Sequence, residues 1–174
     1  NETKSVEIAL YVDMNVGIGG DIWPAAQLFC DVITNSSQYY LHWKNMFHGK
    51  KVLELGSGNG LISILLDQIY PSLQSITVSD IEDHLELIDE NIRMNNCNQD
   101  RVISKEINWF HYVNRSEDEN ASGEKFDVIL ALECVYKEEL YLPLLRTILF
   151  FMHSESVVLL GMSKSFMSPR FFDI

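Results

Sequence analysis

The sequence contains few cysteines and no pair of them in a C-x-x-C spacing. Only three occur in the 174 residues, Cys30, Cys97 and Cys134, and they lie far apart in apolar or amphipathic stretches. An odd and scattered set argues against both a disulfide framework and a zinc site. We therefore expect reduced, buried thiols in a protein of the cytoplasm, or of the cytoplasm and nucleus.

Basic residues and long apolar runs are also scarce. The chain has 13 Lys and Arg against 25 Asp and Glu, which gives a formal net charge of −12. Because nucleic-acid affinity comes largely from basic side chains that displace counterions, we expect no nucleic-acid partner. The apolar runs are well short of the ~20 residues of a membrane span, so we expect no membrane partner. An acidic chain instead favours a protein partner with a basic segment.

Short apolar runs alternate with amphipathic stripes along most of the chain. Five runs predict strands, at residues 52–55, 75–79, 101–107, 126–132 and 157–160. Three stripes predict helices between them, at residues 61–69, 85–92 and 143–152. This alternation is typical of a Rossmann-like, doubly wound, mainly parallel α/β sheet with helices on both faces. A further helix is predicted over residues 24–40, with Pro24 as its first residue, and the polar residues 114–125 predict a mobile loop.

A glycine-rich turn follows the first predicted strand. Its glycines, Gly56, Gly58 and Gly60, have the spacing G-x-G-x-G, and Asp80 ends the next predicted strand. Glycines at this point let the backbone approach a ligand and offer its amides. A carboxylate at the tip of the second strand can bind two ribose hydroxyls. The arrangement predicts a site for a cofactor that contains adenosine.

The acidic residue before this turn, Glu54, distinguishes between such cofactors. A carboxylate is awkward beside the pyrophosphate of NAD or FAD, but it suits the ammonium group of S-adenosylmethionine (SAM). The alternative is that Glu54 binds a nearby backbone amide or basic side chain.

Five motifs resemble those of a known enzyme family. The stretch 52–61 resembles the first motif of the class I, seven-β-strand, SAM-dependent methyltransferases. Four others resemble motifs of the non-SET protein lysine methyltransferases: Ile22-Trp23-Pro24-Ala25-Ala26, Asn91-Ile92-Arg93-Met94-Asn95, Ile107-Asn108-Trp109 and Glu133-Cys134-Val135-Tyr136, the last in place of D-x-x-Y. The resemblance implies an enzyme that transfers a methyl group from SAM to a lysine amine of a protein and releases S-adenosylhomocysteine (SAH).

The resemblance also implies which residues form the site. Glu133 would orient the nucleophilic nitrogen toward the methyl group, and Tyr136 would wall the substrate channel with an aromatic face that tolerates a cation. The alternative for this pair is a carboxylate at a helix start and a tyrosine in the core. The implied cofactor-binding residues are Trp23, Glu54, Gly56, Ser57, Gly58, Gly60, Asp80, Ile81, Asn108, Trp109 and Leu132. The five histidines lack metal-ligand spacing, so we expect no metal site and assign them surface or capping roles.

Two departures from the family pattern leave alternatives open. Glu133 stands where Asp is usual, and relatives with Glu include a branch that methylates histidine, so a protein histidine methyltransferase is one alternative. An inactive methyltransferase fold used as a binding module is another. A nucleic-acid amino methyltransferase is disfavoured, because residues 133–136 contain no proline and the net charge is negative.

The length predicts one domain over residues 1–174, and we expect a monomeric enzyme. We divide it into an N-terminal segment and helix (1–45), a cofactor-binding core (46–161) and a C-terminal part (162–174). The last part is too short for the family's antiparallel C-terminal hairpin, and the chain starts at Asn1 rather than Met. We therefore expect parts of the natural protein to be absent from this sequence.

Overall fold

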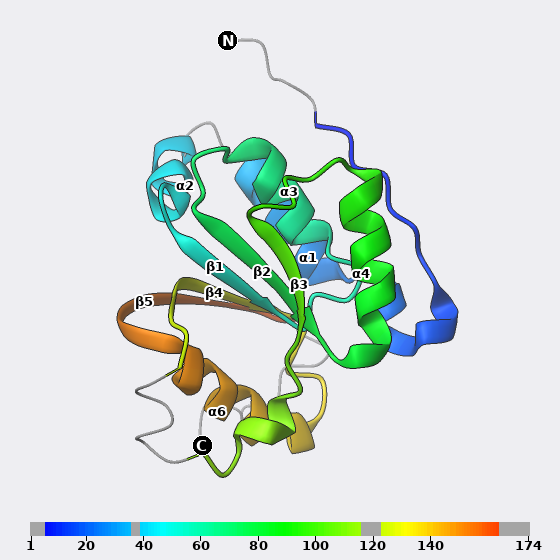
Figure 1. Cartoon of the computed structure of the whole chain (residues 1–174), viewed down its shortest axis with the longest axis vertical. Coiled ribbons are helices and arrows are strands. Elements are labelled where there is room, and N and C mark those ends of the chain that lie inside the picture. Colours follow the sequence, from blue (N-terminus) through cyan, green and yellow to red (C-terminus); the bar gives the residue numbers. More distant parts are fainter. Residues whose placement is uncertain (1–5, 36–38, 116–122, 164–174) are drawn as a thin grey trace.

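A computed structural model describes residues 6–35, 39–115 and 123–163 (Figure 1). The loop predicted over residues 114–125 falls mainly on residues 116–122, which lie outside the described residues. Residues 164–174 also lie outside them, so only the first two residues of the predicted C-terminal part are described.

The described chain forms one five-stranded sheet in which every neighbouring pair of strands is parallel. In the order β3-β2-β1-β4-β5, its strands are Val102–Glu106, Ser75–Asp80, Lys51–Leu55, Phe126–Leu132 and Met152–Gly161. The predicted Rossmann-like α/β sheet is therefore confirmed. Since parallel strands share one direction, their carboxyl ends meet at a single edge, where ligands bind in such folds.

Helices cover both faces of this sheet (Figure 1). One face packs against α1 (Pro24–Asn35), α2 (Tyr40–Phe47), α3 (Leu61–Ile69) and α4 (Glu82–Met94), and the other against α6 (Tyr141–Phe151). Alternate residues of one strand point to opposite faces. In β1, Val52 belongs to the core between the sheet and helices α1 to α4, and its neighbour Leu53 belongs to the core between the sheet and α6. Both residues have 0% exposure. Burial on both faces explains why the strands are continuous apolar runs.

The helix predicted over residues 24–40 is wrong in length. Helix α1 ends at Asn35, a separate α2 begins at Tyr40, and a 3-10 helix, η1 (Met14–Gly20), precedes both. Asn35 is the last residue of α1, and asparagine is common at helix ends because its side chain competes for backbone hydrogen bonds. Phe47 of α2 is fully buried against Tyr70, so packing rather than a long periodic stripe stabilises this short helix.

The predicted helix over residues 143–152 is one residue too long at its carboxyl end. Pro143 lies in the first turn of α6, as expected, but the helix ends at Phe151. Met152 has extended backbone angles and pairs with Phe126 of β4 as the first residue of β5. A methionine fits either state, so sheet pairing rather than residue type sets this boundary.

The described cysteines are all free thiols, with Cys97 and Cys134 buried and Cys30 half-buried. None of the helices in the described ranges is both long and apolar enough to cross a membrane.

Candidate functional site

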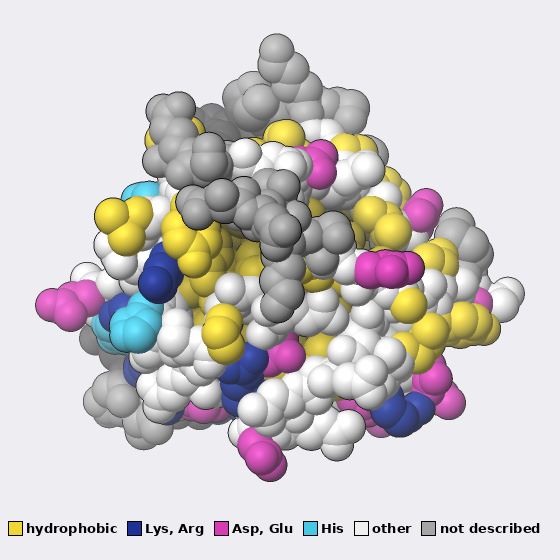
Figure 2. All heavy atoms as spheres, turned by 90° about the horizontal axis from the view of Figure 1, so that it is seen from above, with side chains coloured by type: hydrophobic (Ala, Val, Ile, Leu, Met, Phe, Trp, Pro, Cys, Tyr) yellow, Lys and Arg dark blue, Asp and Glu magenta, His cyan; other side chains and the backbone are white. Residues whose placement is uncertain are grey.

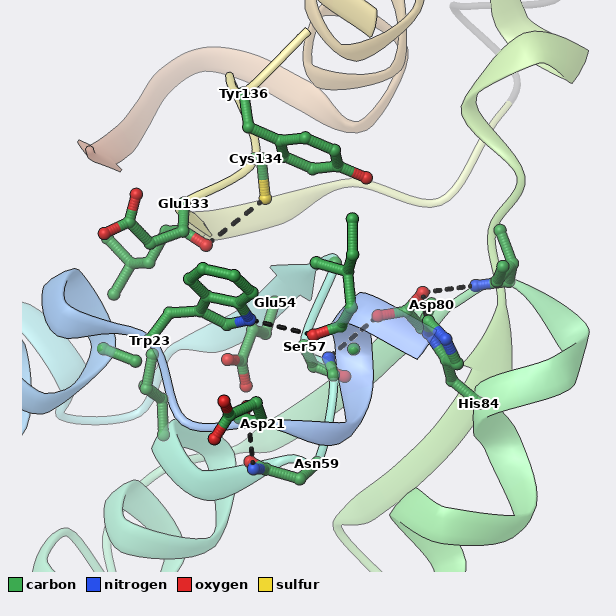
Figure 3. Close-up of a pocket in the computed structure, with 18 of the residues that line it drawn as sticks. Asp21, Trp23, Glu54, Ser57, Asn59, Asp80, His84, Glu133, Cys134 and Tyr136 are labelled. Atoms are coloured by element: carbon green, nitrogen blue, oxygen red, sulfur yellow. Dashed lines mark hydrogen bonds and ion pairs between the residues drawn. The ribbon is translucent and has the colours of Figure 1, made fainter. Parts of the chain in front are cut away.

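A cavity of about 300 Å³ opens at the carboxyl ends of β1, β2 and β4 (Figure 3). The segment that joins η1 to α1 forms one wall of it. All the predicted site residues except Gly60 line this cavity: Trp23, Glu54, Gly56, Ser57, Gly58, Asp80, Ile81, Asn108, Trp109, Leu132, Glu133 and Tyr136. Motifs far apart in the sequence therefore meet at one place.

The glycine turn has the backbone conformation that requires glycine. Gly56 and Gly58 have φ angles of 63° and 58°, which residues with a side chain rarely adopt. A side chain at Gly56 would also meet Cys134 at 2.9 Å and the Trp109 ring at 3.1 Å. Gly60 also has a positive φ, 79°, but it is the N-cap of α3 and is buried against apolar side chains rather than lining the cavity.

The Asp80 carboxylate is held by three hydrogen bonds at the tip of β2. The Gly58 and Ile81 amides each donate to it at 2.8 Å, and Nδ1 of His84 lies 2.7 Å from Oδ1. The predicted surface position of His84 is wrong, because this ring is buried. Asp80 ends β2 and His84 lies in the first turn of α4, so the short connection between these elements brings the two side chains together. The imidazole packs against Gly19, where a Cβ would lie 2.3 Å from the ring.

Glu54 lies beneath the turn with only 3% exposure. Its Oε2 accepts hydrogen bonds from both the amide and the hydroxyl of Ser63, the first at 3.1 Å. The predicted alternative, a bond to a backbone amide, is therefore realised, while the side chain still lines the cavity. Burial raises the pKa of Glu54 to about 7, opposed by the bonds from Ser63 and assisted by the charge of Asp80.

We expect the substitution Glu54→Gln to change thermal stability in a pH-dependent way. Because the folded-state pKa of about 7 exceeds the ordinary value of 4.5, folding favours the protonated carboxyl. Stability from this group is complete below pH 4.5 and is lost as pH rises through 7. Glutamine mimics the protonated form, so the Tm of Glu54→Gln relative to the parent should rise between pH 5 and pH 8. The exposed Glu86→Gln is the matched control, and a Tm difference that does not vary with pH would contradict the assignment.

Two tryptophans line the cavity, Trp23 and Trp109. Trp23 projects into it from the start of α1, and its indole Nε1 donates to the carbonyl of Ile18 at 2.9 Å (Figure 3). Trp109 begins η2 (Trp109–Tyr112), which Asn108 caps by accepting a hydrogen bond from the Phe110 amide at 3.1 Å. Aromatic walls of this kind suit a planar or apolar ligand group.

Glu133 directly follows β4 in a strained backbone conformation. Its φ is +58°, which is unusual for a residue with a side chain and costs of order 1–3 kcal/mol. The Ala25 amide in the first turn of α1 donates to Oε1 at 3.1 Å, and the Ser163 amide donates to Oε2 at 3.0 Å. The Ser163 hydroxyl bonds to Oε1 as well. In Figure 3 the Glu133 carboxylate points away from Tyr136. The carboxylate thus caps a helix, as the alternative reading expected, but the helix is α1 rather than the segment that follows.

Tyr136 lies at the edge of the cavity with 36% exposure. Together with Ile18, Trp23 and Glu133 it lines a second, smaller cavity of about 80 Å³, which shares these residues with the first. Burial is the main cause of the raised pKa of its phenol. Two of the four residues that line the smaller cavity, Trp23 and Tyr136, are aromatic.

Sequence reasoning missed the wall contributed by the segment before α1. Ile18, Gly19, Asp21 and Ile22 all line the cavity. The Asn59 side chain connects this wall to the glycine turn by donating to the carbonyl of Asp21 at 3.2 Å. No periodic pattern marks such a segment, although its position just before the Trp23 motif could have suggested it. In the described residues, no three His, Cys, Asp or Glu side chains form a group that could hold a metal ion.

The chain is similar in sequence to known proteins over most of its length. Residues 2–173 match the family model described as lysine methyltransferase. The protein-lysine N-methyltransferase EFM6 of Saccharomyces cerevisiae is 31% identical over 169 residues, which cover 90% of this chain and 68% of the yeast protein. The EEF1A lysine methyltransferase 3 of Xenopus tropicalis is 24% identical over 156 residues, which cover 90% of this chain and 62% of the frog protein.

Solved structures share the same fold. One of them is coclaurine N-methyltransferase bound to N-methylheliamine and SAH, with a TM-score of 0.55 and 17% identity. The match covers 92% of this chain and 40% of that one. At this identity the likeness concerns the fold and not the substrate.

Proposed function

The chain belongs to the lysine methyltransferase family, and on that premise we propose that it transfers a methyl group from SAM to a lysine side chain of a protein substrate. The observation that carries the proposal is the cavity itself. It gathers the glycine turn and Asp80, which suit adenosine, in the same crevice as Glu133 and Tyr136, which suit an acceptor. Sites of about 300 Å³ and larger, with a few convergent polar groups, are typical of small-molecule binding.

The residues of the cavity assign a place to each part of the cofactor. SAM supplies an activated methyl group on a sulfonium sulfur. Asp80, held by Gly58 and His84, would bind the ribose hydroxyls, and Trp109 and Asn108 would border the adenine. Glu54 and Trp23 would face the methionine end. An acidic group at this place fits an ammonium far better than a pyrophosphate, which favours SAM over NAD.

The smaller cavity suits the end of a lysine side chain. Ile18, Trp23 and Tyr136 offer apolar and aromatic surface to its methylene groups. Lysine has an unperturbed pKa of about 10.4 and must react as a neutral amine. Burial of the amine in the smaller cavity would lower its pKa and so favour the neutral form. A carboxylate offers about four acceptor sites. Glu133 can therefore accept an N–H of the substrate in addition to the bonds from Ala25 and Ser163, and so orient the nitrogen lone pair.

The charge of the chain favours a substrate with a basic segment. Five exposed acidic residues either line the cavity or lie within two positions of a lining residue in the sequence: Asp21, Glu82, Asp83, Glu138 and Glu139. Lys137 lies among them and pairs with Glu139 at 3.9 Å. On the face drawn in Figure 2, acidic and basic side chains are interspersed. Attraction of a basic protein segment to the cavity side would raise the rate of association and weaken with salt.

A protein histidine methyltransferase is the second candidate, because residue 133 is Glu rather than the Asp usual for the lysine group. The named relatives that match this chain act on lysine by their names, and this favours the first candidate.

The test of the proposed function is transfer of a labelled methyl group. We expect the chain, incubated with labelled SAM and a cell extract, to label protein, and mass spectrometry to place the label on lysine. A labelled histidine would select the second candidate. Binding of SAM without transfer to any protein of the extract would favour a binding module and contradict the proposal.

A further inference from the structure

A two-rung ladder of hydrogen bonds connects the N-terminal segment to α4. We call residues 6–20 the strap. The Asn95 side chain accepts from the Ala9 amide at 3.0 Å and donates to the Ala9 carbonyl at 2.7 Å. The Asn91 side chain accepts from the Tyr11 amide at 2.7 Å and donates to the Tyr11 carbonyl at 3.0 Å. Each asparagine thus pairs with one strap residue in both directions, as a neighbouring strand would.

The spacing of the two partners explains why this pairing is possible. Residues four apart on a helix are separated by about 6 Å along its axis. Residues two apart in an extended chain are separated by about 6.6 Å. Asn91 and Asn95 therefore match Ala9 and Tyr11 in step, and a shift of the strap by one residue would break both rungs. The ladder fixes the register of the strap.

Asn91 also connects the strap to the glycine turn. Its side chain has 0% exposure, and its amide group donates to the carbonyl of Asn59 at 2.9 Å as well as to Tyr11. One buried side chain thus joins α4, the strap and the turn. A buried amide with its hydrogen bonds satisfied in this way specifies a single arrangement of its neighbours.

Beyond the ladder, the strap runs over the candidate site. Ile18 and Gly19 line the large cavity, and Gly19 packs against both His84 and Gly58. The Ile18 carbonyl accepts the hydrogen bond from Trp23. In Figure 1 the strap descends along α4 before it reaches the carboxyl ends of the strands. The position of this wall therefore depends on how the strap is held upstream.

We propose that Asn91 and Asn95 are positioning residues for the cofactor. They hold the strap in register on α4, and the strap in turn places Ile18 and Gly19 over the glycine turn and slows the release of SAM. This inference rests on the proposed function, because it concerns retention of the same cofactor. It assigns a role in cofactor residence to the N-x-x-x-N motif, whose two asparagines do not themselves line the cavity.

The test compares Asn95→Ala and Asn95→Asp with the parent, because Asn95 is only half-buried and tolerates change better than Asn91. Asn95→Asp keeps the size and the acceptor but loses the donor to Ala9. The control is Arg93→Ala, an exposed position of the same helix whose pair with Glu90 lies away from the strap. All measurements are made at a temperature well below each Tm.

We expect both Asn95 variants to release SAM about tenfold faster, equivalent to about 1.4 kcal/mol. Turnover at saturating SAM should stay near that of the parent, and the control should match the parent in release. Hydrogen exchange at the Ala9 and Tyr11 amides should speed up in the variants alone. A merely structural role would lower Tm and leave the release rate unchanged.

Three outcomes would overturn the inference. Unchanged release with faster exchange would mean that the strap does not retain the cofactor. Unchanged exchange would mean that the ladder does not hold the strap. A parent protein that binds no SAM would refute the proposed function and this inference with it. This third outcome is distinguished from the first two because it is observed in the protein without any substitution.

Discussion

Gly58→Ala is expected to weaken SAM binding by about 100-fold, or about 2.7 kcal/mol. Gly58 has a φ of +58°, so alanine pays roughly 1–2 kcal/mol for a left-handed conformation. Its new Cβ would also lie 2.6 Å from the carbonyl oxygen of Gly19. That atom belongs to the backbone of the strap and cannot rotate away. The strap must therefore move off the turn, and the Gly58 amide is drawn away from Asp80, which it binds at 2.8 Å.

Gly49→Ala is the matched control for this substitution. Gly49 has a similar φ of +66° with no atom within 4 Å of an added Cβ, and it precedes β1, at the opposite end of the strand from the turn. It should lower Tm by the conformational cost and leave SAM affinity unchanged. Calorimetry with SAM and SAH on both variants makes the comparison. If Gly58→Ala bound SAM as tightly as Gly49→Ala does, the close approach of strap and turn would have no role in binding.

The parts of the fold that could be predicted are those in which local pattern and packing agree. The strand at 52–55 is buried on both faces, and its apolar run therefore indicates a central parallel strand. The glycine turn and Asp80 could be placed because they follow such strands directly. The carboxyl ends of parallel strands meet, so their loops had to meet as well.

The parts that could not be predicted depend on contacts between distant segments. The strap has no hydrophobic period, and its hydrogen bonds to Asn91 and Asn95 cross about 80 residues of sequence, as separations of 80 and 86 positions show. The sequence predicts a surface or capping role for His84, because a lone histidine carries no signal of burial. Its place follows from Gly19, where the lack of a side chain leaves room for the ring.

Glu133 shows why a motif alone does not assign a role. The sequence placed it at the carboxyl end of β4, and the structure agrees, but the motif says nothing of where the carboxylate points. Its bonds to Ala25 and Ser163 connect the end of β4 to the helix that carries Trp23. One carboxylate therefore has a structural task and is proposed to have a catalytic one, and the two must be separated by experiment.

Glu133→Ala is expected to reduce methyl transfer by about 100- to 1,000-fold, as the loss of a group that orients the reacting nitrogen. It should also lower the stability of the protein by about 0.5–2 kcal/mol, because the first turn of α1 loses its acceptor. The alanine variant alone therefore cannot distinguish the two roles.

The substitution Glu133→Gln can distinguish them, because its amide oxygen still accepts from Ala25 while the charge is lost. Its amide nitrogen replaces the oxygen that accepts from the Ser163 amide, so we expect a Tm somewhat below that of the parent, a SAM affinity close to that of the parent, and most of the turnover lost. Glu133→Asp, with a shorter reach, should keep part of the turnover if lysine is the acceptor. Ser163→Ala is the control, because it removes one bond to Glu133 and leaves the carboxylate. The measurements are Tm, SAM affinity and turnover on the labelled substrate for all four variants. A fully active Glu133→Gln enzyme would show that turnover does not need the negative charge, because the amide oxygen can still accept an N–H of the substrate. A fully active Glu133→Ala enzyme would assign Glu133 to helix capping alone.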